Sequence, residues 1–233
     1  MSKLSICLLT YNRMDYAKLT IDSLFAHLVV PPDYEIYLHI ADDGTPNPDY
    51  IPTLMNYMVA AYRDAPGMQQ EAIVIGSTNS EQGGYGKNYN LAMQACHLDA
   101  DYVMPIEDDW VLARDLVIED LVRVFNDYPD VGCIRLGYLS YTQELRGTVI
   151  ASNNNKYLLL DPTSDEPHVF AGHPRLETVK WAQEVGPWPE GYLPGETEFR
   201  VSVMQARKGI AWPMDLTRSC GDLFQHIGTV RSY

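Results

Sequence analysis

Three consecutive acidic residues, Glu107, Asp108 and Asp109, directly follow an apolar run at residues 102–106. Carboxylates crowded at the end of a buried strand repel one another unless a cation or solvent screens them. Carboxylates at positions i and i+2 can share one divalent ion, above all when a diphosphate supplies further oxygen ligands. Because Mg²⁺ and Mn²⁺ prefer such hard ligands, we interpret the triplet as a metal site rather than as a solvated loop.

Three further polar clusters follow apolar runs in the same way. They are TYNR at residues 10–13, DDGT at residues 42–45 and the glycine-rich GGYGKN at residues 83–88. The last two also have structural explanations, since DDGT makes a good turn with a helix cap and glycines suit a tight connection. Taken alone, each of these two is better explained by structure than by function.

The first half of the chain alternates between strand-like and helix-like segments. Short apolar runs predict strands, and apolar residues at helical spacing predict helices. We expect strands at residues 4–9, 34–40, 72–75 and 102–106, and helices at residues 14–28, 50–62 and 87–96. Repeated βα units of this kind require a parallel sheet with right-handed crossovers, and such sheets bind ligands at the carboxyl ends of their strands. All four polar clusters fall there.

The second half of the chain has a less regular pattern. We expect helices at residues 116–125, 177–184 and 199–206, a strand at residues 132–139, and a turn at residues 153–155 between two short strands. The tail after Pro213 has no clear pattern. Because neither an internal repeat nor a low-complexity linker interrupts the sequence, we expect a single domain over residues 1–233.

Composition and charge limit the classes of function. The net charge of −14 repels nucleic acid and anionic lipid. The four cysteines show no CxxC spacing, and Cys7 and Cys133 lie in apolar runs, so we expect buried reduced thiols rather than a disulfide framework or a zinc site. We identify neither a signal peptide nor an apolar run of the ~18–20 residues that a membrane span needs. We therefore expect a cytoplasmic protein without a membrane span.

In their order along the chain, these segments resemble the donor-binding half of family-2 GT-A glycosyltransferases. Members of that family show a strand followed by TYNR, an Asp-Asp-Gly-Ser loop, an Ala-Arg-Asn helix start and an Asp-x-Asp (DXD) metal motif. In the second half, VGPWPE at residues 185–190 resembles the family's Val-Gly-Gly-Phe-x-Glu segment. GETE at residues 195–198, before a helix that ends at Gly209, resembles the stretch that carries the catalytic base. The resemblance covers residues 3–212.

The resemblance implies an α/β GT-A fold, which is a Rossmann-like, mostly parallel sheet with helices on both faces plus a small acceptor-side β/α subregion. It implies a nucleotide-sugar donor half at residues 1–112, an acceptor and catalytic half at residues 113–213, and a C-terminal tail at residues 214–233. The implied activity is metal-dependent transfer of a sugar, with inversion, from a nucleotide diphosphate sugar, a UDP-sugar being favoured, to a hydroxyl acceptor. The acceptor stays unidentified, and the acidic surface disfavours nucleic acid without excluding it.

Site residues carry over from the family position by position. Asp109 takes the metal position, and the metal would be Mn²⁺ or Mg²⁺, while Glu107 or Asp108 would contact ribose or metal-bound water. The implied donor-binding residues are Thr10, Tyr11, Arg13, Asp42, Asp43, Lys87, Asn88, Glu107 and Asp108. Lys87 stands where the family often has arginine, and should meet the base or the diphosphate.

The catalytic base falls on one of two glutamates. The family shows Gly-Glu-Asp with aspartate as the base, but this chain has Thr197 at the corresponding place. Counting back from the glycine that ends the helix favours Glu198 over Glu196 as the group that removes the acceptor proton. Both glutamates are explained nearly as well as residues at a helix N-terminus, where the helix dipole favours negative charge.

His226 is the remaining candidate. A C-terminal histidine folds back onto the metal in some GT-A enzymes, whereas a histidine near a terminus is otherwise a surface or packing residue.

Two alternatives to a glycosyltransferase remain. A nucleotidyltransferase is disfavoured because TYNR replaces the basic phosphate loop after the first strand. A non-catalytic or degenerate nucleotide-sugar-binding protein is kept open by the departure at Thr197.

Overall fold

The structure is a computed structural model of residues 1–233 that describes residues 1–68, 70–96, 100–137, 145–163, 169–214 and 223–228. The main sheet contains β1 (Ser2–Thr10), β3 (Tyr34–Asp42), β4 (Ala72–Thr78), β5 (Tyr102–Glu107), β8 (Cys133–Arg135), β9 (Gly147–Ser152), β10 (Asn155–Leu160), β11 (Arg175–Thr178) and β12 (Ile210–Pro213). Two small sheets pair β2 (Leu28–Val29) with β7 (Leu116–Val117), and β6 (Trp110–Leu112) with β13 (Phe224–His226). The helices are α1 (Met14–His27), α2 (Tyr50–Asp64), α3 (Tyr85–Cys96), α4 (Ile118–Asp127), α5 (Val179–Val185) and α6 (Pro194–Met204).

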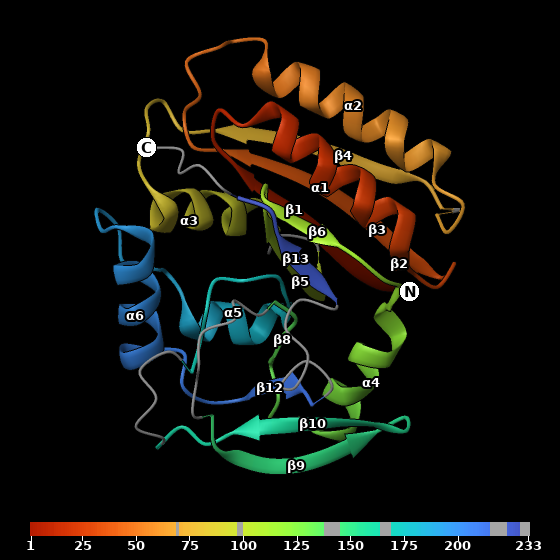
Figure 1. Cartoon of the computed structure of the whole chain (residues 1–233), viewed down its shortest axis with the longest axis vertical. Helices are drawn as coiled ribbons and strands as arrows, with labels where there is room; N and C mark the ends of the chain where they lie inside the picture. The colour runs from red at the N-terminus through yellow and green to blue at the C-terminus, as the bar shows by residue number, and fades with distance from the viewer. Residues whose placement is uncertain (69, 97–99, 138–144, 164–168, 215–222, 229–233) are drawn as a thin grey trace.

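The main sheet has the order β4-β3-β1-β5-β11-β8-β12-β10-β9 (Figure 1). Its first four strands are parallel, so their carboxyl ends meet at one edge, where Thr10 of β1 lies beside Asp42 of β3. β11 runs antiparallel between β5 and β8, and β12 returns parallel to β8. The predicted α/β architecture with a large, mostly parallel sheet is confirmed, and the antiparallel hairpin of β9 and β10 closes the far end.

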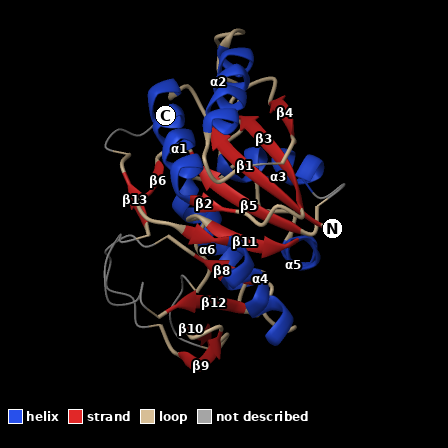
Figure 2. Ribbon diagram, turned by 90° about the vertical axis from the view of Figure 1, so that its right-hand side faces the viewer, coloured by secondary structure: helices blue, strands red, loops and turns tan. Residues whose placement is uncertain are grey.

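Helices cover both faces of the sheet, as Figures 1 and 2 show for α1 and α2 on one side and α3 and α5 on the other. Successive side chains of a strand point to opposite faces, and β1 divides accordingly. Leu4, Ile6 and Leu8 join the core under α1 and α2, while Cys7 and Leu9 join the core under α3, α5 and α6. A strand buried on both faces reads as a continuous apolar run, which is why its position was predictable.

All seven elements expected in the first half are present with small shifts at their ends. β1, β3 and β4 extend up to three residues further than the apolar runs, so Thr10 and Asp42 are the last residues of their strands. α3 begins at Tyr85 rather than at residue 87, which places the glycine-rich segment at the first turn of the helix.

Several elements of the second half differ from the sequence-based expectations. The helix expected at 177–184 is wrong at its start, because Glu177 belongs to β11 and α5 begins only at Val179. The helix expected at 199–206 begins earlier, at Pro194, so that Glu196 and Glu198 both lie within α6. The helix expected at 116–125 begins after the short strand β7. The strand expected at 132–139 is only β8, and residues 138–139 lie outside the described residues.

Three of the remaining expectations concern the turn, the cysteines and membrane spans. The turn between β9 and β10 is confirmed, with Asn153 and Asn154 in the left-handed region. Cys7, Cys96 and Cys133 are buried free thiols, as expected, and Cys220 lies outside the described residues. None of the helices in the described ranges is both long enough and apolar enough to cross a bilayer. A cytoplasmic location stays a prediction, as does the division into halves.

Candidate functional site

A cavity of about 550 Å³ opens at the carboxyl ends of β1, β3 and β5. It is lined by Leu9, Thr10, Tyr11, Arg13, Asp43, Gln82, Gly83, Gly84, Tyr85, Asn88, Glu107, Asp108, Gly191, Tyr192, Leu193, Pro194 and Glu196. Most of the predicted donor-binding residues are therefore together on its wall. Of the described site residues, Asp42, Lys87, Asp109, Glu198 and His226 are not part of the lining.

Asp108 is the centre of a buried hydrogen-bond network at the base of this cavity. Its carboxylate accepts bonds from Thr10 Oγ1 at 2.8 Å, from the Tyr11 backbone N–H at 3.3 Å and from Arg13 Nε at 3.0 Å. Tyr50 of α2 adds a 2.5 Å contact from its hydroxyl to Thr10 Oγ1. Burial raises the pKa of Asp108 to about 6, against the opposing effect of Arg13. The TYNR segment and the acidic triplet thus form one structural unit.

Arg13 occupies the position between two carboxylates where a cation is needed. Its Nη2 lies 2.5 Å from Asp108 Oδ1 and 2.5 Å from Asp109 Oδ2. Burial opposes the charge of the guanidinium, but Asp108, Asp109 and Glu107 hold its pKa above the ordinary value. In this state the protein screens its own acidic cluster, which agrees with the repulsion expected from the sequence.

Asp43 organises the glycine-rich loop. Its Oδ1 accepts bonds from Asn79 Nδ2 and from the Gly83 N–H, both at 2.9 Å, and its Oδ2 accepts from the Gly84 N–H at 2.8 Å. Burial raises the pKa of Asp43, and the three donors offset part of that effect. Because both glycines line the cavity, this carboxylate determines the shape of one wall.

Asp42 has a different environment from Asp43. Its Oδ2 accepts bonds from the Thr45 N–H and from Thr78 Oγ1, each at 2.8 Å, and Gly44 N–H adds a longer one. These bonds close the DDGT turn, so Asp42 lies behind the cavity wall and supports it. The structural explanation of DDGT therefore applies to Asp42, and the functional explanation applies to Asp43.

The two residues predicted at the start of α3 also differ. The amide nitrogen of Asn88 donates to the Ala41 carbonyl at 3.1 Å, while its Oδ1 is buried and has no hydrogen-bond partner among the described residues. A buried acceptor without a partner is costly, and this residue lines the cavity, where a ligand donor would satisfy it. The stem of Lys87 packs along Gly83, outside the cavity lining.

Glu107 faces the acceptor half of the chain. Its Oε2 accepts a 3.4 Å bond from Trp110 Nε1. Burial raises its pKa well above the usual range, and the charges of Asp109, Glu198 and Asp108 raise it further. Glu107 therefore links the acidic triplet electrostatically to the predicted base on α6.

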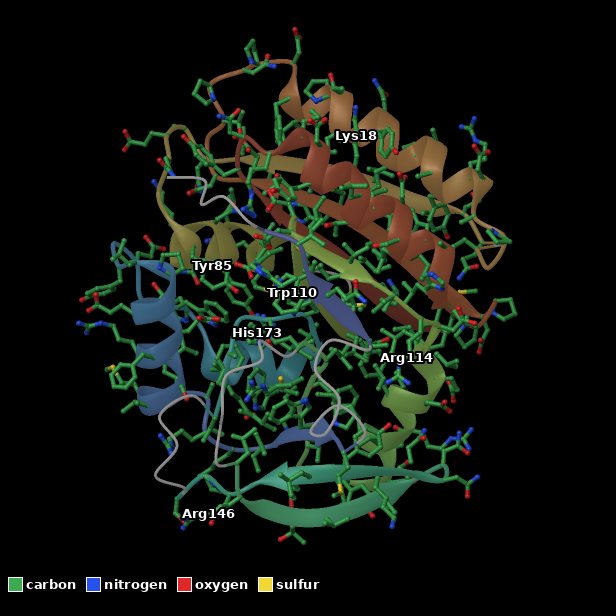
Figure 3. The ribbon with its side chains drawn as sticks, in the orientation of Figure 1. Lys18, Tyr85, Trp110, Arg114, Arg146 and His173 are labelled. Carbon is green, nitrogen blue, oxygen red and sulfur yellow. The ribbon has the colours of Figure 1, made fainter. Side chains whose placement is uncertain are left out.

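The C-terminal segment folds back onto Asp109. His226 Nε2 lies 3.3 Å from Asp109 Oδ2, and the Ile227 N–H donates to the Asp109 carbonyl at 2.9 Å. A Cβ at Gly228 would come within 2.2 Å of Asp109 Oδ2, so the close approach requires glycine. The Trp110 ring is close to the rings of both His226 and His173, with centroids 5.0 and 5.1 Å away. Figure 3 labels Trp110 and His173 near the centre of the molecule.

The two candidate bases have different surroundings. Glu198 Oε1 accepts a bond from the Gly172 N–H at 2.5 Å, and the hydroxyl of Tyr85 donates to the Gly172 carbonyl at 3.0 Å. Glu196 lines the cavity but is exposed, and it forms an ion pair with Arg200 at 2.7 Å. Glu198 is therefore held against a fixed loop, whereas Glu196 is paired on the surface.

The acidic cluster fits a divalent ion only with ligands from elsewhere. Among the described residues, the one group of three or more His, Cys, Asp or Glu side chains with converging ligand atoms is Cys7, His39 and Cys96, which includes none of Glu107, Asp108 and Asp109. Asp109 and His226 offer one carboxylate and one imidazole, which suits Mn²⁺ if a ligand supplies the remaining oxygens.

Sequence reasoning missed the residues that brace the site. Arg175 and Glu177 are fully buried and form an ion pair, and Arg175 Nη1 donates to the Gly172 carbonyl at 2.8 Å. They hold the loop that contacts Glu198. The cavity wall at residues 191–194 was also missed. Glu177 was predicted to begin a helix and Arg175 lay outside every predicted element, so the strand that joins them was not recognised.

Comparison with known proteins identifies the family. Residues 5–185 match glycosyl transferase family 2. The chain belongs to this family. Membership confirms the glycosyltransferase class expected from the sequence, and no curated protein matches the chain closely enough to add to it.

Solved structures of glycosyltransferases share the fold at low sequence identity. They include S. aureus TarS 1–349 in complex with UDP-GlcNAc (TM-score 0.61, 13% identity, 98% of this chain and 61% of TarS 1–349). GalNAc-T7 with UDP, GalNAc and Mn²⁺ has a TM-score of 0.63 at 14% identity, over 100% of this chain and 45% of GalNAc-T7. The Pyrobaculum calidifontis mannosyltransferase PcManGT with GDP-Man and Mn²⁺ has a TM-score of 0.54 at 12% identity, over 90% of this chain and 56% of the enzyme. The chain spans 35% and 57% of two further TarS structures.

Proposed function

We propose that the chain transfers a sugar, with inversion, from a nucleoside diphosphate sugar to an acceptor hydroxyl, and that a divalent ion assists. The observation that carries the proposal is the cavity at the strand ends of a family-2 chain, lined by Thr10, Asp43, Asn88 and Asp108. A UDP-sugar is favoured, because TarS and GalNAc-T7 hold UDP compounds in their similar structures, whereas PcManGT holds GDP-Man.

In this proposal the nucleoside occupies the part of the cavity between β1 and the glycine-rich loop. The unpartnered Asn88 Oδ1 accepts a hydrogen bond from the nucleotide base, and Gly83 and Gly84, fixed by Asp43, let the backbone approach it closely. Asp108 and Glu107 are placed to accept bonds from ribose hydroxyls. Asp42 supports this wall from behind, and the position of Lys87 at the loop suits a contact with an outer phosphate.

Asp109 and His226 would hold the divalent ion, Mn²⁺ or Mg²⁺, which supplies positive charge beside the departing diphosphate. Arg13 spans Asp108 and Asp109, and in this proposal its guanidinium turns to the diphosphate when the divalent ion binds the carboxylates. In this proposal a cation balances the negative charge of Asp108 and Asp109 both before and after the ligand binds.

Glu198 accepts the proton of the acceptor hydroxyl as its oxygen attacks the anomeric carbon of the sugar. The bond from Gly172 fixes the carboxylate, and the helix position of Glu198 brings it toward Glu107. Glu196 is the alternative base. The remaining catalysis comes from placing the two substrates side by side.

The proposal is tested with a panel of nucleoside diphosphate sugars, each added with Mn²⁺. We expect one UDP-sugar to raise the melting temperature and to be hydrolysed slowly when no acceptor is present, because water can replace the hydroxyl. Binding without any hydrolysis or transfer would point instead to a non-catalytic sugar-nucleotide-binding protein. The absence of both binding and hydrolysis across the panel would contradict the proposed function.

A further inference from the structure

Three potential metal ligands meet inside the donor half, away from the cavity. Cys7 of β1 and His39 of β3 are direct neighbours across two parallel strands, and Cys96 is the last residue of α3 above them. Their ligand atoms all lie within 4.8 Å of one another, and the residues are 0%, 1% and 4% exposed. Neither the cavity nor the proposed reaction uses any of the three.

The ring of His39 is held in the orientation that a metal ligand needs. Its Nε2 lies 2.8 Å from Ser77 Oγ, and its Nδ1 lies 3.3 Å from Cys96 Sγ. Histidine ligands usually bond a protein oxygen through the second ring nitrogen, which fixes the tautomer and frees the first nitrogen for the metal. If Nε2–H donates to Ser77, the lone pair of Nδ1 faces the sulfur atoms.

We propose that Cys7, His39 and Cys96 form a structural zinc site. In a tetrahedral zinc site, bonds of about 2.3 Å to sulfur and about 2.0 Å to nitrogen put sulfur and nitrogen roughly 3.6 Å apart. The observed 3.3 Å between His39 Nδ1 and Cys96 Sγ is close to that separation, so only small side-chain adjustments are needed. Soft thiolate ligands select zinc over the hard cations that suit the acidic cluster.

Charge balance favours zinc at this depth. Two thiolates, one neutral imidazole and Zn²⁺ together carry no net charge, so the assembly avoids the cost of an unpaired charge in the core. Ser5 precedes Cys7 by two residues on the same face of β1, and its buried hydroxyl has no hydrogen-bond partner among the described residues. This oxygen, or a water that it binds, is available as the fourth ligand.

The site would join the three elements that shape the donor cavity. Cys7 and His39 each lie three residues before the end of their strand, at Thr10 and Asp42. α3, which ends at Cys96, begins at the glycine-rich loop. Zinc would therefore bind β1, β3 and α3 to one another, and this inference does not depend on the proposed activity.

The test uses the full chain, reduced under anaerobic conditions, incubated with zinc and dialysed. We expect about one zinc ion per chain and an X-ray absorption spectrum with two sulfur ligands and one imidazole. Cys96→Ser should lose the sulfur-ligated zinc, while Cys133→Ser should keep it, because Cys133 is another buried free thiol outside the cluster. Wild-type protein should also melt at a higher temperature with zinc than after chelation, since zinc binds the folded state.

Cobalt provides a second readout that distinguishes this site from the acidic one. Co²⁺ bound by thiolates shows a sulfur-to-metal charge-transfer absorption, which carboxylate and imidazole ligands do not produce. Asp109→Ala should leave this band unchanged. The inference is overturned if zinc is absent after dialysis, or if the wild-type spectrum shows only oxygen and nitrogen ligands. A third contradicting outcome is that protein reduced and then treated with zinc binds no zinc, and forms a disulfide between Cys7 and Cys96 when it is exposed to air.

Discussion

Asp42 and Asp43 are adjacent in sequence, but their side chains form different hydrogen bonds because β3 ends at Asp42. Asp42 closes the DDGT turn through Thr45 and Thr78, while Asp43 points across the turn to the N–H groups of Gly83 and Gly84. A single side chain thus connects two of the polar clusters that sequence analysis could only place in order along the chain.

We expect Asp43→Asn to weaken nucleoside diphosphate binding at least about tenfold without unfolding the protein. The amide keeps one acceptor oxygen, but at least one glycine N–H is left without its charged partner, and such bonds contribute about 1.5–3 kcal/mol. Calorimetry on the folded variant measures the effect. Asp49→Asn is the control, because Asp49 is exposed and its side chain does not cap α2. Equal affinity in the two variants would remove Asp43 from the donor site.

Glu198→Gln should lower transfer about 10²–10⁴-fold, because removal of a general base has effects of this size. Donor binding should persist, since Glu198 is not part of the cavity lining. The paired experiment is Glu196→Gln, which breaks an exposed ion pair with Arg200 and should change the rate little. The reverse outcome would make Glu196 the base, and two active variants would place the proton acceptor elsewhere.

At the scale of elements, β11 and the loop before it connect the catalytic half to the donor half. Arg175 is buried among the rings of Tyr89, Phe170 and Trp188, and its charge is compensated by Glu177. The same guanidinium bonds to the Gly172 carbonyl, and the Gly172 N–H holds Glu198. A buried ion pair between residues at positions i and i+2 of one strand thus positions the predicted base.

Glu177→Gln should lower the free energy of unfolding by about 3–5 kcal/mol, because it leaves a buried arginine charge without its partner. Glu184→Gln on the exposed side of α5 is the matched control, with an expected change within about 0.5 kcal/mol. Chemical denaturation of both variants measures the difference. Similar stabilities would mean that the pair is not needed for the fold.

The sequence predicted the donor half far better than the acceptor half, for a physical reason. Parallel strands buried on both faces, such as β1, are continuous apolar runs, and the helices between them have apolar residues at helical spacing. β11 instead carries two charged residues, Arg175 and Glu177, which compensate each other's charge in the core. Their types suggest an exposed segment, so the burial of β11 cannot be predicted without the tertiary contacts. α6 begins with Pro194-Gly195, which is typical of a loop, although proline also suits the first turn of a helix.

The sequence predicted which residues belong to the candidate site, but it did not predict the contacts among them. Family resemblance gave Asp108 and Asp109 adjacent roles, but it did not indicate that Arg13 spans both of them. The contact of His226 with Asp109 depends on pairing between β6 and β13, two strands too short to leave a pattern. Such long-range pairings are decided by packing rather than by local propensity.

At the scale of the whole molecule, the site depends on both ends of the chain. Arg13 comes from the first loop, Asp109 from the middle and His226 from the C-terminal segment, and all three meet at one carboxylate oxygen. The protein itself offers few ligands for a hard cation, so the ion needs oxygens from a diphosphate to complete its shell. Metal and donor should therefore bind cooperatively, each raising the affinity for the other by the same factor.

A titration of Mn²⁺ in the presence and in the absence of UDP tests this central claim most directly. We expect weak binding of Mn²⁺ alone, at least about tenfold tighter binding with UDP, loss of the coupling in Asp109→Ala and a weakened coupling in His226→Ala. Mn²⁺ is chosen because it prefers the oxygen ligands of this site to thiolates. Equal Mn²⁺ affinity with and without UDP, or full transfer activity in the presence of a chelator, would contradict the metal-assisted mechanism.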